Sequence, residues 1–322
     1  MVIVPDGGSR GRILIDRSHS TEPSAPFDLL LYAVGYESRS RHLAEQASDL
    51  YSRAVGVRFN QDELFSFRAN LDWAYSQEKI SVEVAETEVA AGQILFRYLE
   101  TSGHYRVLID VSSFPRTYLA EIIMALWRFT TELGVDVLAE FGYSVPTFSE
   151  PALEHGPVVS FGAVRPDFVG LSETGWGLAT LIGLGYEPDL ALAAQQVLDP
   201  AVTWLGIPRS ADDRFDDEVA ASNEVLLDVV ESENIWTYDV SNPTSTFVTL
   251  ESIVSGLRRQ HNVVLVPFGP KLFAAICMLV SLAHKQEVGV WRLSAGSFRE
   301  SRDQVAAGPV HSLKVRFSAM AP

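Results

Sequence analysis

The feature that most constrains the fold of this 322-residue chain is an alternation of short apolar runs with stretches of helical spacing, repeated along its length. In the first half, five apolar runs of strand length are separated by four amphipathic stretches. The expected strands are 28–34, 54–59, 80–85, 107–109 and 135–141. Neighbouring parallel strands need a long crossover, usually a helix, so this alternation is typical of a parallel, doubly wound sheet.

The second half goes through the same order of elements. Its expected strands are 177–184, 202–207, 235–240, 262–266 and 288–293. A Gly-Pro-Val turn and an alternating run follow in each half, at 158–164 and 310–317, and predict one closing antiparallel strand per half. The sequence thus predicts an α/β protein of two tandem Rossmann-like repeats, each a mostly parallel five-stranded sheet with flanking helices and a closing antiparallel strand. The expected segments are a polar N-terminal tail over 1–26 and repeats over 27–165 and 176–322.

Local matches between the halves indicate an internal duplication. Gly35-Tyr36-Glu37 corresponds to Gly185-Tyr186-Glu187, and Arg116 corresponds to Lys271. Further matches pair 67–70 with 220–223, and the Gly-Pro-Val segment from 156 with that from 308. The separation between partners drifts only slowly, as loop insertions in a duplicated domain would cause. A short linker over 165–175 leads us to expect that the repeats pack against each other as a pseudo-two-fold pair.

The turn after the fourth expected strand is the best candidate for a ligand loop in the first half. It carries Asp110, Ser112, Ser113 and Arg116, and a strongly apolar helix follows. Ligands of open α/β sheets bind at the carboxyl ends of the strands, where helix N-termini favour anions. A cation in the first helical turn costs a few tenths to about 1 kcal/mol, whereas a charged hydrogen bond to phosphate contributes about 1.5–3 kcal/mol. The alternative is that Ser113 caps the helix, Asp110 bonds its own loop and Arg116 is solvated.

The equivalent turn of the second half keeps a cation but loses the hydroxyls. Gly269 permits close backbone approach there, and Lys271 follows a proline as Arg116 does. The alternative is a plain Gly-Pro turn with an exposed lysine.

The two Gly-Tyr-Glu motifs lie at the ends of the first strands of the two halves. The glycine of each motif can meet a ligand, the tyrosine can stack on a base, and the glutamate can accept a hydrogen bond from a ribose hydroxyl. The alternative is a structural role for each residue: a glycine in a turn, a tyrosine that caps the core, and a glutamate at a helix N-terminus. Four arginines can add positive potential to the first half, the best placed being Arg58; the others are Arg39, Arg41 and Arg68.

Composition narrows the classes of partner. A formal net charge of -16 disfavours non-specific binding to nucleic acid or anionic lipid, but a few local arginines can still hold a small phosphorylated ligand. With 47% hydrophobic residues the chain can bury a large core, and its apolar stretches are too short to span a membrane. Cys277 is the single cysteine, and the histidines lack metal-ligand spacing. We therefore expect a cytoplasmic protein with no metal, no cofactor and no membrane contact.

The pattern Asp-x-Ser-x-x-x-Arg over 110–116 resembles the characteristic loop of CARF (CRISPR-associated Rossmann fold) domains. In that family two such domains pair about a two-fold axis and bind a cyclic oligoadenylate or related nucleotide, and SAVED domains are a fused-pair version. The resemblance implies ligand-loop roles for Asp110, Ser112 and Arg116, with 35–37 nearby and Lys271 as a partial counterpart. By position the second half has Leu265 and Pro267 where the first has Asp110 and Ser112.

These observations predict a nucleotide-binding sensor, for a ligand such as a cyclic oligonucleotide, in a prokaryotic signalling or antiviral defence system. The ligand is expected between the repeats, and the output is expected to pass through a separate effector protein. No catalytic motif is visible. The alternatives are an enzyme acting on a nucleotide, such as a cyclic-oligonucleotide phosphodiesterase or a nucleoside N-glycosidase using Ser112, Glu37 or Glu187, and a scaffold with vestigial clefts.

Overall fold

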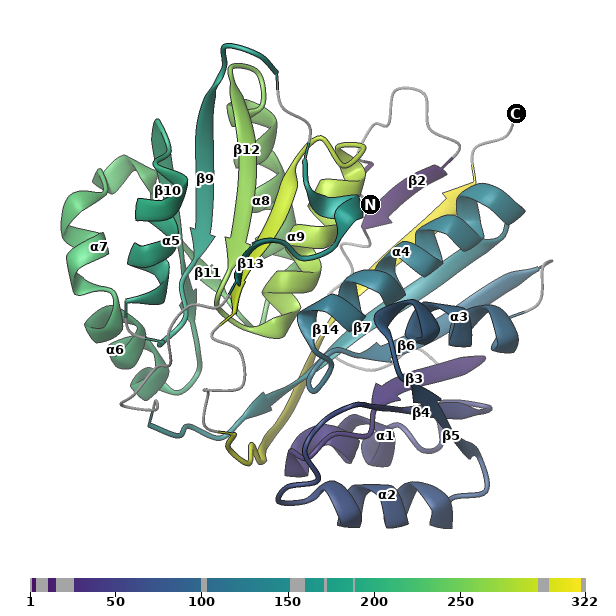
Figure 1. Cartoon of the computed structure of the whole chain (residues 1–322). Helices are drawn as coiled ribbons and strands as arrows, with labels where there is room; N and C mark the ends of the chain where they lie inside the picture. Colours follow the sequence, from purple (N-terminus) through teal and green to yellow (C-terminus); the bar gives the residue numbers. More distant parts are fainter. Residues whose placement is uncertain are drawn as a thin grey trace. The chain divides into compact units, whose positions relative to one another are not determined.

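A computed structural model describes residues 2–3, 11–15, 26–99, 103–150, 160–170, 173–187, 189–294 and 301–319 (Figure 1). The chain divides into two compact units. Unit 1 comprises Met1–Thr147 together with Arg302–Pro322, and unit 2 comprises Phe148–Ser301. The chain therefore leaves unit 1, builds the whole of unit 2, and returns to unit 1 for its last strand.

Unit 1 is an eight-stranded sheet with helices on both faces. Its strands are β1 (Val2–Ile3), β2 (Gly11–Ile15), β3 (Leu29–Ala33), β4 (Ala54–Phe59), β5 (Ile80–Ala85), β6 (His104–Asp110), β7 (Asp136–Pro146) and β14 (Ala306–Ala319). Helices α3 (Glu88–Tyr98) and α4 (Arg116–Leu133) pack together on one face. The 3-10 helix η1 (Ser38–Arg41), α1 (His42–Gln46) and α2 (Phe67–Ser76) lie on the other (Figure 1).

Unit 2 is a six-stranded sheet with the same plan. Its strands are β8 (Ser160–Ala163), β9 (Gly177–Gly183), β10 (Val202–Arg209), β11 (Ile235–Asp239), β12 (His261–Pro267) and β13 (Gly289–Ser294). Its longer helices are α5 (Leu190–Leu198), α6 (Asp213–Ser222), α7 (Glu224–Val229), α8 (Pro243–Leu257) and α9 (Lys271–Ala283), and its 3-10 turns are η2 (Pro166–Phe168) and η3 (Ser232–Asn234). The side chains of α9 from Leu272 to Ala283 are all buried.

The parallel part of each sheet has the same strand order, which confirms the predicted fold class. In unit 1 the order is β5-β4-β3-β6-β7, and in unit 2 it is β11-β10-β9-β12-β13. All of these neighbours pair in parallel. The central strand β3 is a continuous apolar run with every side chain buried because both faces of the sheet are covered by helices, whereas the edge strands β5 and β11 are only partly buried.

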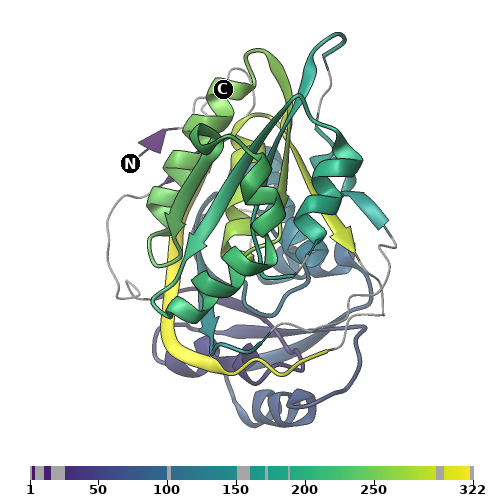
Figure 2. The same cartoon turned by 90° about the vertical axis from the view of Figure 1, so that its left-hand side faces the viewer.

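The closing antiparallel strands are present, but each joins the sheet of the other repeat than the one to which the sequence assigned it, so that assignment was wrong. The strand at 160–163, β8, pairs with β13 of unit 2. The last strand, β14, pairs with β7 of unit 1 and is the long curved yellow strand in Figure 2. The expected boundaries, 27–165 and 176–322, placed each strand with the repeat just before it in the chain. An alternating pattern specifies which face of a strand is buried, whereas the partner strand is set by long-range packing.

The segment expected to be a polar tail contributes structure to unit 1. Strand β2 lies antiparallel against β14, and β1 pairs with β2. Within β2 the side chains of Ile13 and Ile15 are buried and Arg12 is exposed. This alternation is only five residues long, which is why the polar residues around it obscured it. No described helix is long and apolar enough to cross a lipid bilayer.

Candidate functional site

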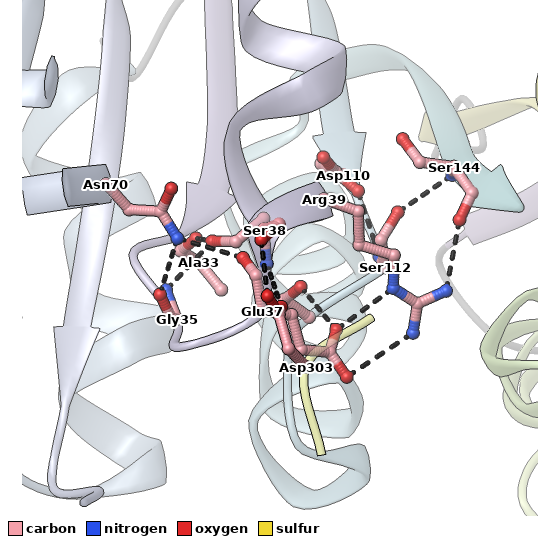
Figure 3. A network of polar contacts seen from close by, with 12 residues as sticks. Ala33, Gly35, Glu37, Ser38, Arg39, Asn70, Asp110, Ser112, Ser144 and Asp303 are labelled. Carbon is pink, nitrogen blue, oxygen red and sulfur yellow. Dashed lines mark hydrogen bonds and ion pairs between the residues drawn. The ribbon is translucent and has the colours of Figure 1, made fainter. Parts of the chain in front are cut away.

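The two loops of unit 1 that were predicted to contact a ligand lie side by side (Figure 3). They follow β3 and β6, which are adjacent parallel strands and therefore end at the same edge of the sheet. The Ser113 hydroxyl donates a hydrogen bond of 2.8 Å to Oε2 of Glu37. A Cβ atom on Gly35 would lie 3.4 Å from Cβ of Ser113. The structure thus joins Gly35, Glu37 and Ser113 in one place.

Buried polar side chains fix the backbone of the loop after β3. The Ser40 hydroxyl accepts from the amide of Gly35 at 2.9 Å and donates to the carbonyl of Ala33 at 2.6 Å. The side-chain amide of Asn70 donates to the carbonyls of Gly35 and Glu37, at 2.8 and 2.9 Å. Ser40 and Asn70 are both buried. Paired backbone groups of this kind are what a pre-organised binding loop requires.

An ion pair between Arg39 and Glu37 is the main electrostatic feature of this loop. Nε of Arg39 lies 3.0 Å from Oε2 of Glu37, and the side chains are only 6% and 14% exposed. Nη1 of Arg39 also donates to the carbonyl of Ser144 at 3.1 Å, and the guanidinium lies over the ring of Tyr143. Burial acts to lower the pKa of Arg39, but Glu37 and Tyr143 outweigh it and raise the pKa above its ordinary value. Arg39 is therefore a permanent cation, and Glu37 is compensated before any ligand arrives.

The structure places Asp110 and Ser112 beneath the surface of the loop after β6. Oδ1 of Asp110 accepts from the amide of Ser112 at 2.9 Å, and the Ser112 hydroxyl accepts from the amide of Ser144 at 2.8 Å. Both residues are buried, and among the described residues Oδ2 of Asp110 has no hydrogen-bond partner. Burial raises the pKa of Asp110 to about 6, although its hydrogen bonds with Ser112 act to lower it. In this state the two side chains hold the loop, and a contact with ligand stays a prediction.

Arg116 is the first residue of α4, as predicted, and is half-buried. The interpretation that Ser112 or Ser113 caps this helix was wrong. The N-cap residue is Pro115, no side-chain cap bond is present, and the two hydroxyls instead bond Ser144 and Glu37. The other arginines considered from the sequence are partly compensated locally, since Arg58 and Arg68 pair with Glu63 and Arg41 pairs with Glu45.

An exposed aromatic residue stands beside the Gly-Tyr-Glu motif of unit 1. The ring of Phe65 lies 6.0 Å from that of Tyr36, and Phe65 is 58% exposed. Its φ of 43° is in the left-handed region, which a bulky residue adopts only when its surroundings hold it there. The backbone of the next residue, Ser66, donates to the carbonyl of Tyr36 at 3.0 Å. Sequence reasoning missed Phe65, because the run Leu64-Phe65-Ser66-Phe67 gives no local signal of this backbone conformation.

The segment that returns from unit 2 also reaches this loop. The Asp303 carboxylate accepts from both the amide and the hydroxyl of Ser38, each at 2.6 Å. The amide of Arg39 donates to the carbonyl of Gln304 at 2.9 Å. Sequence reasoning missed Asp303 because 265 positions separate it from Ser38. From the sequence Arg39 is expected only to add positive potential, since no local pattern shows that this side chain is buried.

Unit 2 repeats the backbone contacts of the first loop. The side-chain amide of Asn223 donates to the carbonyl of Gly185 at 2.8 Å, as Asn70 does to Gly35. The ring of Tyr186 lies 5.9 Å from that of Phe215, matching the pair in unit 1. The matched position of the asparagines in 67–70 and 220–223 was a signal in the sequence that could have identified this shared contact.

In unit 2 the loop after β12 lies closer to the loop after β9 than the corresponding loops of unit 1 lie to each other. A Cβ atom on Gly269 would lie 2.7 Å from the carbonyl oxygen of Leu184, and one on Gly185 would lie 3.0 Å from that of Phe268. Glycine at these two positions therefore has a packing role. Lys271 is the first residue of α9 and is half-buried, and Glu187 is half-buried in the loop after β9. Asp189 stands two positions after Glu187, where unit 1 has Arg39 two positions after Glu37. Unit 2 therefore has no counterpart of Arg39 at this position.

Comparisons with known proteins do not assign the chain to a family. No protein-family model matches the chain, and no curated protein matches it. One solved structure that does match is titled as a Type III CRISPR defence DNA nuclease activated by cyclic oligoadenylate. The match has a TM-score of 0.44 at 10% sequence identity and covers 80% of this chain. The chain spans 64% of the length of that nuclease.

Proposed function

We propose that this chain is a nucleotide-sensing module of a prokaryotic signalling or defence system, with its principal ligand loops in unit 1. The proposed ligand is a small phosphorylated molecule of the nucleotide class, such as a cyclic oligonucleotide. The proposed output passes to a separate effector protein.

The observation that carries the proposal is the gathering of three kinds of recognition group at one edge of the sheet of unit 1. The aromatic pair of Tyr36 and Phe65 offers a stacking surface for a base. Glu37 and Ser113, already hydrogen-bonded to each other, offer an acceptor and a hydroxyl for a sugar. Arg116, three residues after Ser113, offers a cation for phosphate at the start of α4. Base, sugar and phosphate together make a nucleotide.

The left-handed backbone of Phe65 gives this argument a second support. Holding a bulky residue in this region costs on the order of 1–3 kcal/mol, and the exposed ring recovers little of that by burial. A stacked base would bury the free face of the ring and contribute about 1–3 kcal/mol. The strain is therefore explained if Phe65 is held ready for a ligand.

The test is calorimetric titration of the full chain with a panel of cyclic oligoadenylates and linear adenylates. Binding by the wild type is expected, and Phe65→Ala should weaken it about tenfold through loss of stacking. The matched control is Tyr75→Ala, because Tyr75 is an exposed aromatic on α2 that has no part in the proposed site. Equal affinities for the wild type and Phe65→Ala would contradict the stacking role. No binding to any member of the panel, and no nucleotide released from purified protein by mass spectrometry, would contradict the proposal itself.

A further inference from the structure

Helices α5, α6 and α7 cover one face of the sheet of unit 2, and α8 and α9 cover the other (Figure 1). Residues at the start of α5 and where α6 meets α7 line a groove. The groove has a volume of about 260 Å³ and is open to solvent. Its lining combines carboxylates with apolar side chains, chiefly Asp189, Glu218, Glu224, Leu192, Val225 and Leu226. The nucleotide site proposed above uses none of these residues.

The rim of the groove is acidic. Asp189 and Glu224 are exposed, and Glu218 is half-buried and accepts from the Ser222 hydroxyl at 3.2 Å. None of the described residues that line the groove is basic. The neighbouring surface of α6 adds Asp213 and Asp217, both exposed, and its Arg214 is paired with Asp212. A field of one sign in a concave surface attracts a ligand of opposite charge and repels phosphate groups.

The floor and one side of the groove are apolar, and this character continues beyond it. Leu226 is buried and Leu192 half-buried, while Val225 is 57% exposed. Val229, one helical turn further along α7, is 64% exposed. Residues four apart lie on the same face of a helix, so the two valines form an apolar stripe that starts in the groove. A small cation would leave this stripe uncovered.

We propose that this groove docks a basic amphipathic segment of a protein partner. The lysine or arginine side chains of that segment would face Glu224 and Glu218, and its apolar side chains would cover Val225 and Val229. The assignment rests on charge complementarity along the rim together with the exposed apolar side chains of Val225 and Val229 beside it. It does not depend on nucleotide binding.

The groove is also tied to the duplicated loop of unit 2. The Ser222 hydroxyl, which lines the groove, also contacts the carbonyl of Tyr186 at 3.2 Å. The adjacent Asn223 holds the carbonyl of Gly185. A partner in the groove would therefore contact the elements that fix the Gly-Tyr-Glu motif of this unit.

The experiment uses the full chain and a fluorescently labelled amphipathic helical peptide composed of leucine and lysine, in buffer near physiological ionic strength. A second peptide with every lysine replaced by glutamate tests the sign of the charge. The groove variant is Glu224→Lys with Val225→Ser, since both residues are exposed and their replacement leaves the core intact. The matched control is Glu233→Lys with Val197→Ser, which changes the same residue types and the same net charge at exposed positions outside the groove.

The groove variant should bind the lysine peptide at least about tenfold more weakly than the wild type, as measured by fluorescence anisotropy, and the control should change it less than about twofold. The glutamate peptide should not bind. Equal weakening in both variants would overturn the proposal in favour of general attraction to an acidic protein. Analytical sedimentation tests whether the groove instead binds a second copy of this chain. A dimer that the wild type and the control form but the groove variant does not would overturn the proposal.

Discussion

The strand-end loops of unit 1 and unit 2 have the same backbone support and different charges. Asn70 and Asn223 hold equivalent glycine carbonyls, and an aromatic pair accompanies each Gly-Tyr-Glu motif. Arg39 compensates Glu37 in unit 1, whereas Asp189 stands two residues after Glu187 in unit 2. The comparison teaches that the contacts that shape the loop are the same in both units, whereas the buried Arg39–Glu37 ion pair belongs to unit 1 and has no counterpart at Glu187 and Asp189.

Of the substitutions that test this comparison, replacing Arg39 should have the largest effect on the free energy of unfolding. We expect Arg39→Ala to lower the free energy of unfolding by about 3–5 kcal/mol, because it leaves the largely buried carboxylate of Glu37 without its partner. Asp189→Ala, at an exposed position whose φ of 64° suits aspartate better than alanine, should lower it by only about 1 kcal/mol. Denaturant titration of both variants measures the difference.

A second variant separates the ion pair from simple loss of packing. Adding Glu37→Gln to Arg39→Ala removes the uncompensated charge, so the double variant should recover part of the lost stability. If Arg39→Ala and Asp189→Ala cost the same, or if the double variant recovers nothing, the two loops do not differ as described.

A smaller effect, which depends on pH, is expected at Asp110. Its unit 2 counterpart by position is the buried Leu265, which cannot titrate. The raised folded-state pKa of about 6 means that the charged carboxylate opposes folding. The stability that the protonated side chain provides is fully present below the ordinary pKa of an aspartate and is lost as the pH rises through about 6. The loss in the free energy of unfolding is up to about 3 kcal/mol.

Asp110→Asn keeps an oxygen that can accept from the amide of Ser112 but carries no charge. It should therefore be more stable than the wild type near pH 8, by at most about 3 kcal/mol, and nearly equal to it near pH 4. Unfolding titrations at both pH values measure this. A stability difference that is the same at both pH values would show that folding does not raise the pKa of Asp110.

The local elements of the fold could be predicted from the sequence because hydrophobic periodicity is a local property. The strands 54–59 and 80–85 were predicted with the bounds that β4 and β5 have. The helical spacing over 216–230 predicts one continuous helix, but the structure has two helices, α6 and α7, that meet at Asn223. The break occurs where that side chain bonds the carbonyls of Gly185 and Val219, a contact that no local pattern shows.

Long-range pairing could not be predicted. The closing strands β8 and β14 alternate equally well, and only the folded sheets show that each joins the unit it does not follow in sequence. The same limit applies to the site. The loops and their hydroxyls were predicted, but the burial of Asp110 and Arg39 and the contact of Asp303 with Ser38 depend on segments that are distant in the chain.

The most direct test of the central claim compares the two cations that begin the equivalent helices. Calorimetric titration with the tightest-binding nucleotide of the panel should show that Arg116→Ala weakens binding at least about tenfold, because a charged hydrogen bond to phosphate is lost. Lys271→Ala should weaken it less than about threefold. If Lys271→Ala weakens binding as much as Arg116→Ala, or if Arg116→Ala leaves it unchanged, unit 1 does not hold the principal ligand loops.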